Sequence, residues 1–478
     1  TVEFFSGTVD LSAIGTEYID FDSVQVDSAA TLDLSNGGSG TTIPSGFTLT
    51  NAGTLSNADT LTIDGVFNNT GSFNNTGTIN SSGAGTFANT GSLDNSGVIT
   101  GDPYGVVGGG TITNSGTLHG TVAGVNFTSD GTINNSGVIS GDQYGAVIGA
   151  GTIINTGTII DAGIAGASLG SGGTLDNDTG GLVAGTVGAV FTGTGASLTN
   201  NGTITGTSGV AVQFDAGVNT FTIGTGSVLN GTVDGGSGAG IVKFAGTGSI
   251  ANTFANFGAG SAIDITSGAS WTATGRWTAA SVVNAGTLQP GTLTTPLKVI
   301  GNFSQTSSGV LQVGLDAGGT GSQLQVSGTA ALDGNVAVIP SGTFVTGAKK
   351  YTIITATGGV SGRFDGVTGG TLLLTPSLSY DAKDAFVTLT QQDASSGGGT
   401  GGGGTTPPGL KETPNEFAVA KAFDIGHKAD SAKFVSALLG LDQFTKAADL
   451  KSALDRMSGE NNADISTAAL LAGRQFIN

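Results

Sequence analysis

Hydrophobic and small polar residues alternate in short runs along most of the chain, and the pattern is most regular between Asn95 and Ile204. In that stretch one phrase returns about every twenty residues: an asparagine, a serine or threonine, a glycine, and then a residue pair ending in Ile or Leu. The copies begin at Asn95, Asn114, Asn135 and Asn155, with looser copies at Asn177 and Asn200. Alternation predicts strands with one buried face, and the fixed period predicts a solenoid of stacked coils. We therefore expect an all-β fold, a right-handed parallel β-helix of about twenty residues per coil.

Stacking explains why the phrase repeats. A single coil cannot bury its apolar face, whereas stacked coils can bury a continuous core. An aliphatic residue holds the same place in successive copies, at Ile99, Leu118, Ile139 and Ile159, which predicts an interior column with a spacing of about 4.8 Å. The asparagines should stack in the same way, each amide bonding to the turn and to the amides of adjacent coils. We expect the glycine of each phrase to adopt backbone angles that other residues resist.

Composition divides the chain into four segments. Residues 1–290 carry the β-helix coils, and residues 291–392, whose alternating runs are longer, are expected to form a C-terminal β-helix module. The Gly- and Pro-rich residues 393–413 predict a flexible linker, and residues 414–478 predict a short α-helical segment. The aromatic residues expected in the core of the first segment are Phe67, Phe73 and Phe87. The apolar stripe of the helical segment consists of Phe434, Leu438, Leu441, Phe444, Leu450 and Leu454.

Charge and cysteine content narrow the function. The protein has 478 residues, 87 of them glycine, and a net charge of −19. No Lys or Arg precedes Lys243, so the first half offers no cation to a phosphate backbone and nucleic acid is not an expected partner. The chain has no cysteine and therefore no disulfide to form, which suits export in an unfolded state. No histidine pair stands at metal-ligand spacing, and the sequence predicts no metal and no cofactor.

Short motifs near the C-terminus form two sets. The first comprises residues 301–305 (Gly-Asn-Phe-Ser-Gln), 309–313 (Gly-Val-Leu-Gln-Val), 324–330 (Leu-Gln-Val-Ser-Gly-Thr-Ala), 351–354 (Tyr-Thr-Ile-Ile) and 359–364 (Gly-Val-Ser-Gly-Arg-Phe). The second comprises residues 413–415 (Thr-Pro-Asn), 418–420 (Ala-Val-Ala) and 453–460 (Ala-Leu-Asp-Arg-Met-Ser-Gly-Glu). The first set resembles the junction, or autochaperone, module that closes the pertactin-like passenger β-helix of bacterial autotransporters. The second resembles the helical segment that leads into their outer-membrane barrel.

The resemblance implies a passenger of type V secretion, located at the cell surface, attached to the Gram-negative outer membrane or released from it. It implies that the passenger folds from its C-terminal module, with each coil serving as the template for the next. The implied partners are molecules on host or neighbouring cells, further copies of the chain, its own outer-membrane barrel and the barrel-assembly machinery. The barrel of the family would follow the helical segment and is not expected within this chain.

Two related turn motifs suggest a possible site. Gly-Asp-Pro-Tyr-Gly at 101–105 returns as Gly-Asp-Gln-Tyr-Gly at 141–145, two coils later, and the coil between them carries His119. In register, a Ser140, His119 and Asp102 triad can be drawn on the outer face. A pair of carboxylates, Asp102 and Asp142, would lie about 10 Å apart, near the range of inverting glycosidases.

The same residues also fit a site without catalysis, and this interpretation is favoured. The two motifs are good turn sequences, and nothing near them predicts an oxyanion hole or a burial that would perturb a pKa. We therefore expect no catalytic residues. The candidate exposed binding patch consists of Asp102, Tyr104, His119, Asp142 and Tyr144.

A second candidate patch surrounds Arg276. Trp271 and Trp277 flank this residue, and a stacked Trp-Arg-Trp cluster could bind a sugar ring. A sheltered cluster at a change in coil cross-section is the favoured interpretation of the two tryptophans.

These observations favour a surface-displayed passenger that acts as a non-enzymatic rod for adhesion or self-association. One alternative is an enzyme that acts on polysaccharide, such as a glycan hydrolase or esterase. Another is a purely structural spacer of a surface layer. A groove with clustered carboxylates and basic residues would favour the enzyme, and the segment before Lys243 cannot supply the basic residues.

Overall fold

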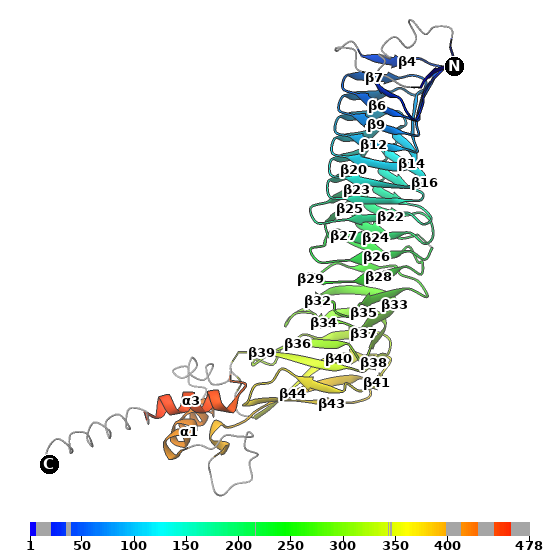
Figure 1. Ribbon diagram of the computed structural model, residues 1–478. Helices are drawn as coiled ribbons and strands as arrows, with labels where there is room; N and C mark the ends of the chain where they lie inside the picture. The colour runs from blue at the N-terminus through cyan, green and yellow to red at the C-terminus, as the bar shows by residue number, and fades with distance from the viewer. Residues whose placement is uncertain are drawn as a thin grey trace, which may run out of the picture. The chain divides into compact units, whose positions relative to one another are not determined.

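The computed structural model describes residues 1–5, 21–34, 40–215, 217–342, 344, 347–397, 413–428 and 444–459. The chain is nearly all β and forms a parallel β-solenoid of about 15 turns with about 21 residues per coil, followed by two short helices (Figure 1). The expected fold class is therefore confirmed. The expected helical residues Phe434, Leu438 and Leu441 lie outside the described residues.

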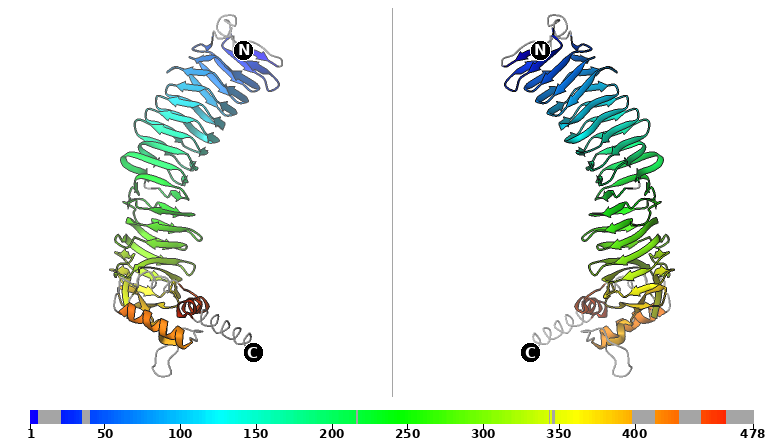
Figure 2. Two further views of the ribbon diagram at one scale, coloured as in Figure 1. Left: turned by 90° about the vertical axis from the view of Figure 1, so that its left-hand side faces the viewer. Right: turned by 90° about the vertical axis from the view of Figure 1, so that its right-hand side faces the viewer.

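The coils divide into two compact units. Unit 1 contains residues 1–271 and 276–283, and unit 2 contains residues 272–275 and 284–478. The boundary lies close to the expected end of the first segment at residue 290. In unit 1 the strands of successive coils lie above one another in both side views (Figure 2), and three parallel ladders form three sides, here called faces A, B and C.

Face A is the ladder that begins at the N-terminus. It consists of β1 (Val2–Phe4), β2 (Ser23–Val26), β5 (Thr48–Asn51), β8 (Val66–Asn69), β11 (Thr86–Asn89), the first parts of β14 (Tyr104–Asn114) and β16 (Ala123–Asn135), β18 (Tyr144–Ile148), β21 (Ala165–Leu169), the last parts of β23 (Leu182–Phe191), β25 (Thr203–Gln213) and β27 (Val228–Asp234), then β30 (Phe254–Ala255) and β33 (Gly275–Asn284).

Face B follows face A around each coil. It consists of β3 (Thr31–Asp33), β6 (Thr54–Asn57), β9 (Ser72–Asn75), β12 (Ser92–Asn95), the last parts of β14 and β16, β19 (Thr152–Asn155), β22 (Thr174–Asn177), β24 (Ser197–Asn200), β26 (Thr220–Ile223), β28 (Ile241–Phe244) and β31 (Ala262–Ile265).

Face C completes each coil. It consists of β4 (Thr41–Ile43), β7 (Thr60–Ile63), β10 (Thr78–Ser81), β13 (Val98–Gly101), β15 (Thr117–Gly120), β17 (Val138–Gly141), β20 (Thr158–Asp161) and the first parts of β23, β25 and β27. Two further strands near the end of unit 1 are β29 (Thr247–Ile250) and β32 (Ser270–Ala273).

The core of unit 1 is built from columns of identical places in successive coils. Ile99, Leu118, Ile139 and Ile159 pair in direct register on face C, and all four side chains are fully buried. The expected aliphatic column is therefore confirmed. The three expected core phenylalanines are also buried, and their rings are in contact at centroid distances of 4.8 to 5.8 Å.

Asparagines form a second kind of column, inside face B. Eight of them join in an unbroken chain in which each Nδ2 donates to the Oδ1 of the next coil at 2.7–2.8 Å. The members of this asparagine ladder are Asn57, Asn75, Asn95, Asn114, Asn135, Asn155, Asn177 and Asn200. All are buried, and most also donate to turn carbonyls, as Asn95 does to Gly97 and Thr117. The expected stack of amides is thus confirmed.

The glycine of each phrase is required by the close approach of adjacent coils and not, as expected, by its backbone angles. The turn glycines Gly97, Gly116, Gly137 and Gly157 have no positive φ. A Cβ on any of them would lie 2.0–2.3 Å from a carbonyl oxygen of the preceding coil. The expectation of unusual backbone angles at these positions was therefore wrong, and close approach of adjacent coils is what requires glycine.

Unit 2 begins with parallel coils and ends in an antiparallel closure. Its parallel strands are β34 (Thr287–Pro290), β35 (Leu297–Gln305), β36 (Val310–Asp316), β37 (Leu324–Val326), β38 (Ala330–Leu332), β39 (Asn335–Ser341), β40 (Gly347–Ala356), β41 (Val360–Gly362) and β42 (Gly366–Thr368). The outer edge of β40 pairs antiparallel with β44 (Asp384–Gln391), which pairs antiparallel with β43 (Leu374–Tyr380). The β43–β44 hairpin therefore covers an edge that would otherwise be open to another chain.

A helical cluster follows the hairpin in unit 2. It contains the 3₁₀ helix η1 (Ala394–Gly397) and the helices α1 (Pro414–Lys428) and α3 (Ala447–Ser458). Asp424 accepts hydrogen bonds from the backbone N–H groups of Ala394 and Ser395, which fastens α1 to the start of η1. The first residues of the expected flexible linker are therefore ordered, and residues 398–412 lie outside the described part. The apolar core of the cluster consists of Leu373, Ala394, Ala420, Phe423, Leu450 and Leu454.

The start of α1 is set by its sequence, Thr413-Pro414-Asn415-Glu416. Thr413 Oγ1 accepts the N–H of Glu416, and Glu416 accepts the N–H of Thr413, which forms a reciprocal capping box with proline at the first helical position. Glu416 is fully buried and pairs with Lys451 of α3. Among the described helices, none is long and apolar enough to cross a membrane.

Candidate functional site

The predicted patch around His119 lies at the corner between faces C and A. Thr100, His119 and Ser140 pair in register on the outer side of face C, as expected. His119 Nδ1 lies 3.0 Å from Ser140 Oγ, and both side chains are half-buried. The carboxylate of Asp102 is exposed beyond the corner and accepts a hydrogen bond from Thr121 Oγ1 at 2.6 Å. Within the described residues no hydrogen bond joins Asp102 to His119, so the structure forms a Ser–His pair and not the triad.

The remaining residues of this patch lie along the same corner. Tyr104 and Tyr144 are half-buried and are separated in the ladder by Ala123, which places them two coils, or about 10 Å, apart. Asp142 is exposed in the turn before Tyr144. The five predicted residues therefore share one corner of unit 1, but they do not converge on a single point.

The corner contains one residue that the sequence did not single out. The corner glycines Gly101, Gly120 and Gly141 are followed in register by Asp161. Burial raises the pKa of the Asp161 carboxyl, and the nearby backbone N–H groups of Gly163, Ile164 and Thr186 oppose this rise. A Cβ on Gly185, in the next coil, would lie 1.8 Å from Asp161 Oδ1. Gly185 therefore provides the space that the carboxyl group occupies.

The second predicted patch is divided between the interior and the surface. Trp277 is fully buried and Trp271 nearly so, whereas Arg276 faces solvent. Phe244 stacks on Trp277 at 5.1 Å and lies 5.1 Å from the Trp271 ring, which makes an aromatic core. A sugar could reach neither indole ring, which speaks against a stacked Trp-Arg-Trp site and favours the sheltered interpretation.

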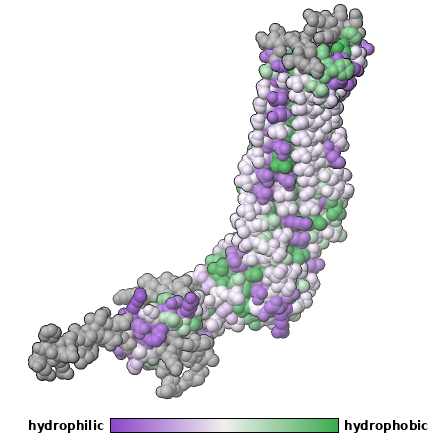
Figure 3. All heavy atoms as spheres, in the orientation of Figure 1, coloured by the Kyte–Doolittle hydropathy of each residue, from purple (hydrophilic) through white to green (hydrophobic). Residues whose placement is uncertain are grey.

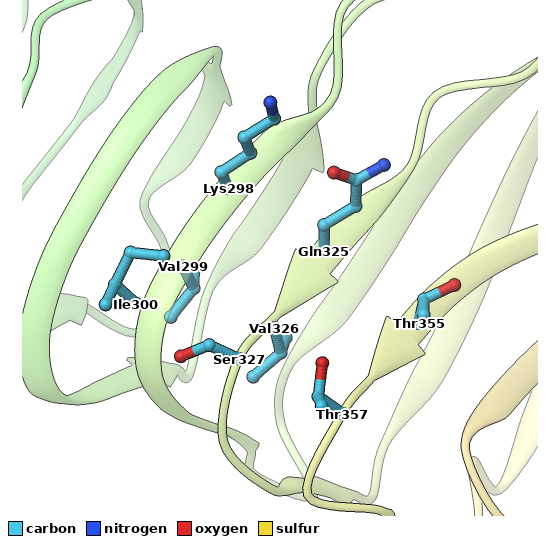
Figure 4. A pocket seen from close by; sticks show the side chains of 8 residues that line it. All are labelled: Lys298, Val299, Ile300, Gln325, Val326, Ser327, Thr355 and Thr357. Carbon is cyan, nitrogen blue, oxygen red and sulfur yellow. The ribbon is translucent and has the colours of Figure 1, made fainter.

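A shallow groove lies on the outer side of unit 2, across β35, β37 and the end of β40, with a volume of about 250 Å³ (Figure 4). Lys298, Gln325 and Thr355 form one row across it in direct register. A second row consists of Ile300, Ser327 and Thr357. Thr355 donates to Asp384 at 2.7 Å. Sequence analysis missed this groove because its residues are separated by irregular intervals in the chain.

These sites differ in what they can do chemically. The Ser–His pair lies on an open strand surface, and the carboxylate of Asp102 is held by Thr121. The groove offers one ammonium group, one amide and several hydroxyl groups, which can form hydrogen bonds to a polar ligand. Within the described residues, no group of three or more His, Asp or Glu side chains is placed to hold a metal ion.

No protein-family model matches the chain, and no curated protein matches it either.

Proposed function

We propose that this chain is the passenger region of an autotransporter, displayed at the surface of a Gram-negative cell, and that its sides make adhesive contacts without catalysis. The observation that carries the proposal is the closure in unit 2. The motifs that resemble the junction module occupy the last parallel coils and β40, to which the antiparallel hairpin β43–β44 is added. A module whose last edge is covered can extend only from its other edge, where it can serve as a template for the coils that precede it.

Several other features support this role. The chain has no cysteine, so it could pass through a narrow pore without a disulfide to reduce. Its partners would be its own outer-membrane barrel and the barrel-assembly machinery during export, and cell-surface molecules or further copies afterwards. In the candidate patch, the hydrogen bond from Thr121 to Asp102 leaves His119 with a serine partner. This arrangement favours adhesion over hydrolysis.

The test is expression of the full-length gene in a Gram-negative host that lacks it. We expect the passenger to be cleaved by protease added to intact cells, and we expect these cells to settle or adhere faster than vector controls. A passenger that stays inside the cell, or one that releases sugars from polysaccharide in a His119-dependent manner, would refute the proposal.

A further inference from the structure

Face C has an outer surface without charge over nine consecutive coils, from β7 to the start of β27. The first and third residues of each of its strands point outward and are exposed or half-buried. These eighteen positions contain no Asp, Glu, Lys or Arg. They are Thr60, Thr62, Thr78, Asn80, Val98, Thr100, Thr117, His119, Val138, Ser140, Thr158, Ile160, Leu182, Ala184, Thr203, Thr205, Val228 and Asn230.

The first residue of each strand gives face C an apolar ridge. In register, this ridge consists of Thr60, Thr78, Val98, Thr117, Val138, Thr158, Leu182, Thr203 and Val228. Eight of the nine are β-branched, and each presents at least one methyl group. Val98, Val138 and Val228 retain 41%, 36% and 47% of their possible exposure. The valines alternate with threonines and Leu182 in the register, so it is the methyl groups of all nine residues that form a strip that another sheet can pack against.

Face B provides the contrast within the same coils. Its outward first positions, from Thr31 to Thr220, are all threonine or serine, with no counterpart to the valines and Leu182 of face C. Its third positions include the carboxylates of Asp33, Asp94 and Asp176. Much of the visible surface of unit 1 is of intermediate hydropathy, with the hydrophilic residues gathered in limited areas (Figure 3).

Charge indicates which partner suits face C. The protein carries a net charge of −19, and unit 1 contains only two basic residues, Lys243 and Arg276. Two copies that met through face B would bring carboxylates together, which is unfavourable. Two copies that met through face C would bring together methyl, hydroxyl and amide groups and the His119 imidazole, and no carboxylate. A second copy of the chain presents the same uncharged ridge, as an isologous interface requires.

The size of face C is sufficient for such an interface. Nine strands spaced by about 4.8 Å, each with about 13 Å of outward surface, give roughly 560 Å² on each copy. Two copies would bury about 1,100 Å² in total, which is just above the lower limit of about 1,000 Å² for a specific interface. Many such weak contacts between two cell surfaces would add up to a strong one.

We propose that the uncharged outer surface of face C is a docking surface for a second copy of this chain, packed face to face. The inference rests on the adhesive role proposed above and assigns it a surface and a partner. Its test in solution does not require display on a cell. If the purified protein self-associates but cells that express it do not adhere, the adhesive role fails and the docking surface stands. If cells adhere but the purified protein stays monomeric, the docking surface fails.

The experiment compares charge placed on two sides of neighbouring coils. Sedimentation equilibrium of the purified chain at up to about 100 µM should show a monomer–dimer equilibrium. Val138→Glu adds a carboxylate at the centre of face C and should weaken the dimer at least tenfold. Asn134→Glu adds the same charge on the exposed side of face B and should leave it unchanged. A wild-type chain that is monomeric throughout, or equal weakening by both variants, would overturn the proposal.

A second measurement, disulfide cross-linking, tests the same interface without introducing a charge. The chain has no cysteine, so Val138→Cys introduces a single thiol. Full overlap of two copies brings residue 138 of one copy next to residue 138 of the other. Mild oxidation should therefore give a disulfide-linked dimer with Val138→Cys and not with Asn134→Cys. Equal cross-linking of the two variants would contradict docking through face C.

Discussion

Each residue of the asparagine ladder has two roles, because its amide holds its own turn and also the next coil. Asn135 accepts from Asn114 at 2.8 Å and donates to Asn155 at 2.7 Å. The adjacent Asn134 points outward on the same strand and is exposed. Two neighbouring asparagines therefore allow a buried amide and a solvated amide to be compared on one strand.

We expect Asn135→Ala to lower the free energy of unfolding by about 1–3 kcal/mol, because it leaves the buried Oδ1 of Asn155 without its donor. Urea unfolding followed by circular dichroism would measure the change. Asn134→Ala is the matched control and should change the stability by less than about 0.5 kcal/mol. Equal effects of the two substitutions would show that the ladder adds nothing to stability.

Some residue positions could be predicted from the sequence, and others could not. The places of Ile99, Leu118 and Asn95 followed from spacing alone, because a regular repeat fixes which side chains stack. The role of Gly97 did not, because the distance between its Cα and the preceding coil appears only once the coils are packed. The burial of Trp277 and the groove at Lys298 depend on irregular coils, in which spacing no longer indicates position.

At the scale of elements, the docking of α1 depends on an ionised carboxylate. Burial alone would raise the pKa of Glu416, but a hydrogen bond shared with the Asp455 side chain, hydrogen bonds from Lys451 and Thr413 and the charge of Lys451 lower it to about 2. A carboxyl group with a lowered pKa in the folded state stabilises that state above its unfolded pKa of about 4.3. The stabilisation is lost as the pH falls through the folded pKa.

We expect α1 to lose hydrogen-exchange protection between about pH 4.3 and about pH 2, whereas the coils of unit 1 keep theirs. Glu416→Gln should make the protection of α1 independent of pH over this range and lower it at pH 7, by about 1 kcal/mol for the weakened capping box. Exchange rates corrected for the intrinsic effect of pH would provide the measurement. Parallel loss of protection in wild type and variant would show that another group is responsible.

The outward surfaces of the three faces were harder to predict from the sequence than the core. Buried positions repeat because stacked side chains must fit together, and the buried columns of faces A, B and C follow from that repeat. Outward positions vary freely, so the lack of charge on face C becomes visible only when strands such as β13 and β17 are aligned in register. The expected patch was drawn around Asp102 and Tyr104, whereas the uncharged outer surface of face C extends over nine coils.

For the whole molecule, folding from the C-terminal module predicts that the coils form in order from the C-terminal end toward the N-terminal end. Removal of residues 297–390 deletes the last coils and the hairpin that covers β40. We expect the remaining coils to refold more slowly from urea and to be cleaved faster by protease, because no covered module is left to serve as a template. Removal of residues 1–94 is the matched control and should leave the rest resistant. Equal protease resistance of the two truncations would count against templating from the C-terminal module.

The asparagine ladder also has a direction. Every amide donates toward the C-terminal end, so the eight side-chain dipoles, joined by seven hydrogen bonds, point the same way and polarise one another. At the C-terminal end, Asn200 Nδ2 finds a hydroxyl partner in Ser227. At the N-terminal end, Asn57 Oδ1 is buried without a partner, since the ladder stops there. A growing stack of coils would thus always present an unfilled carbonyl oxygen to the incoming turn, and an asparagine in that turn fills it with an N–H group. The asparagine ladder would thereby favour the correct register, because a coil that adds in the wrong register leaves this buried oxygen without a hydrogen-bond donor.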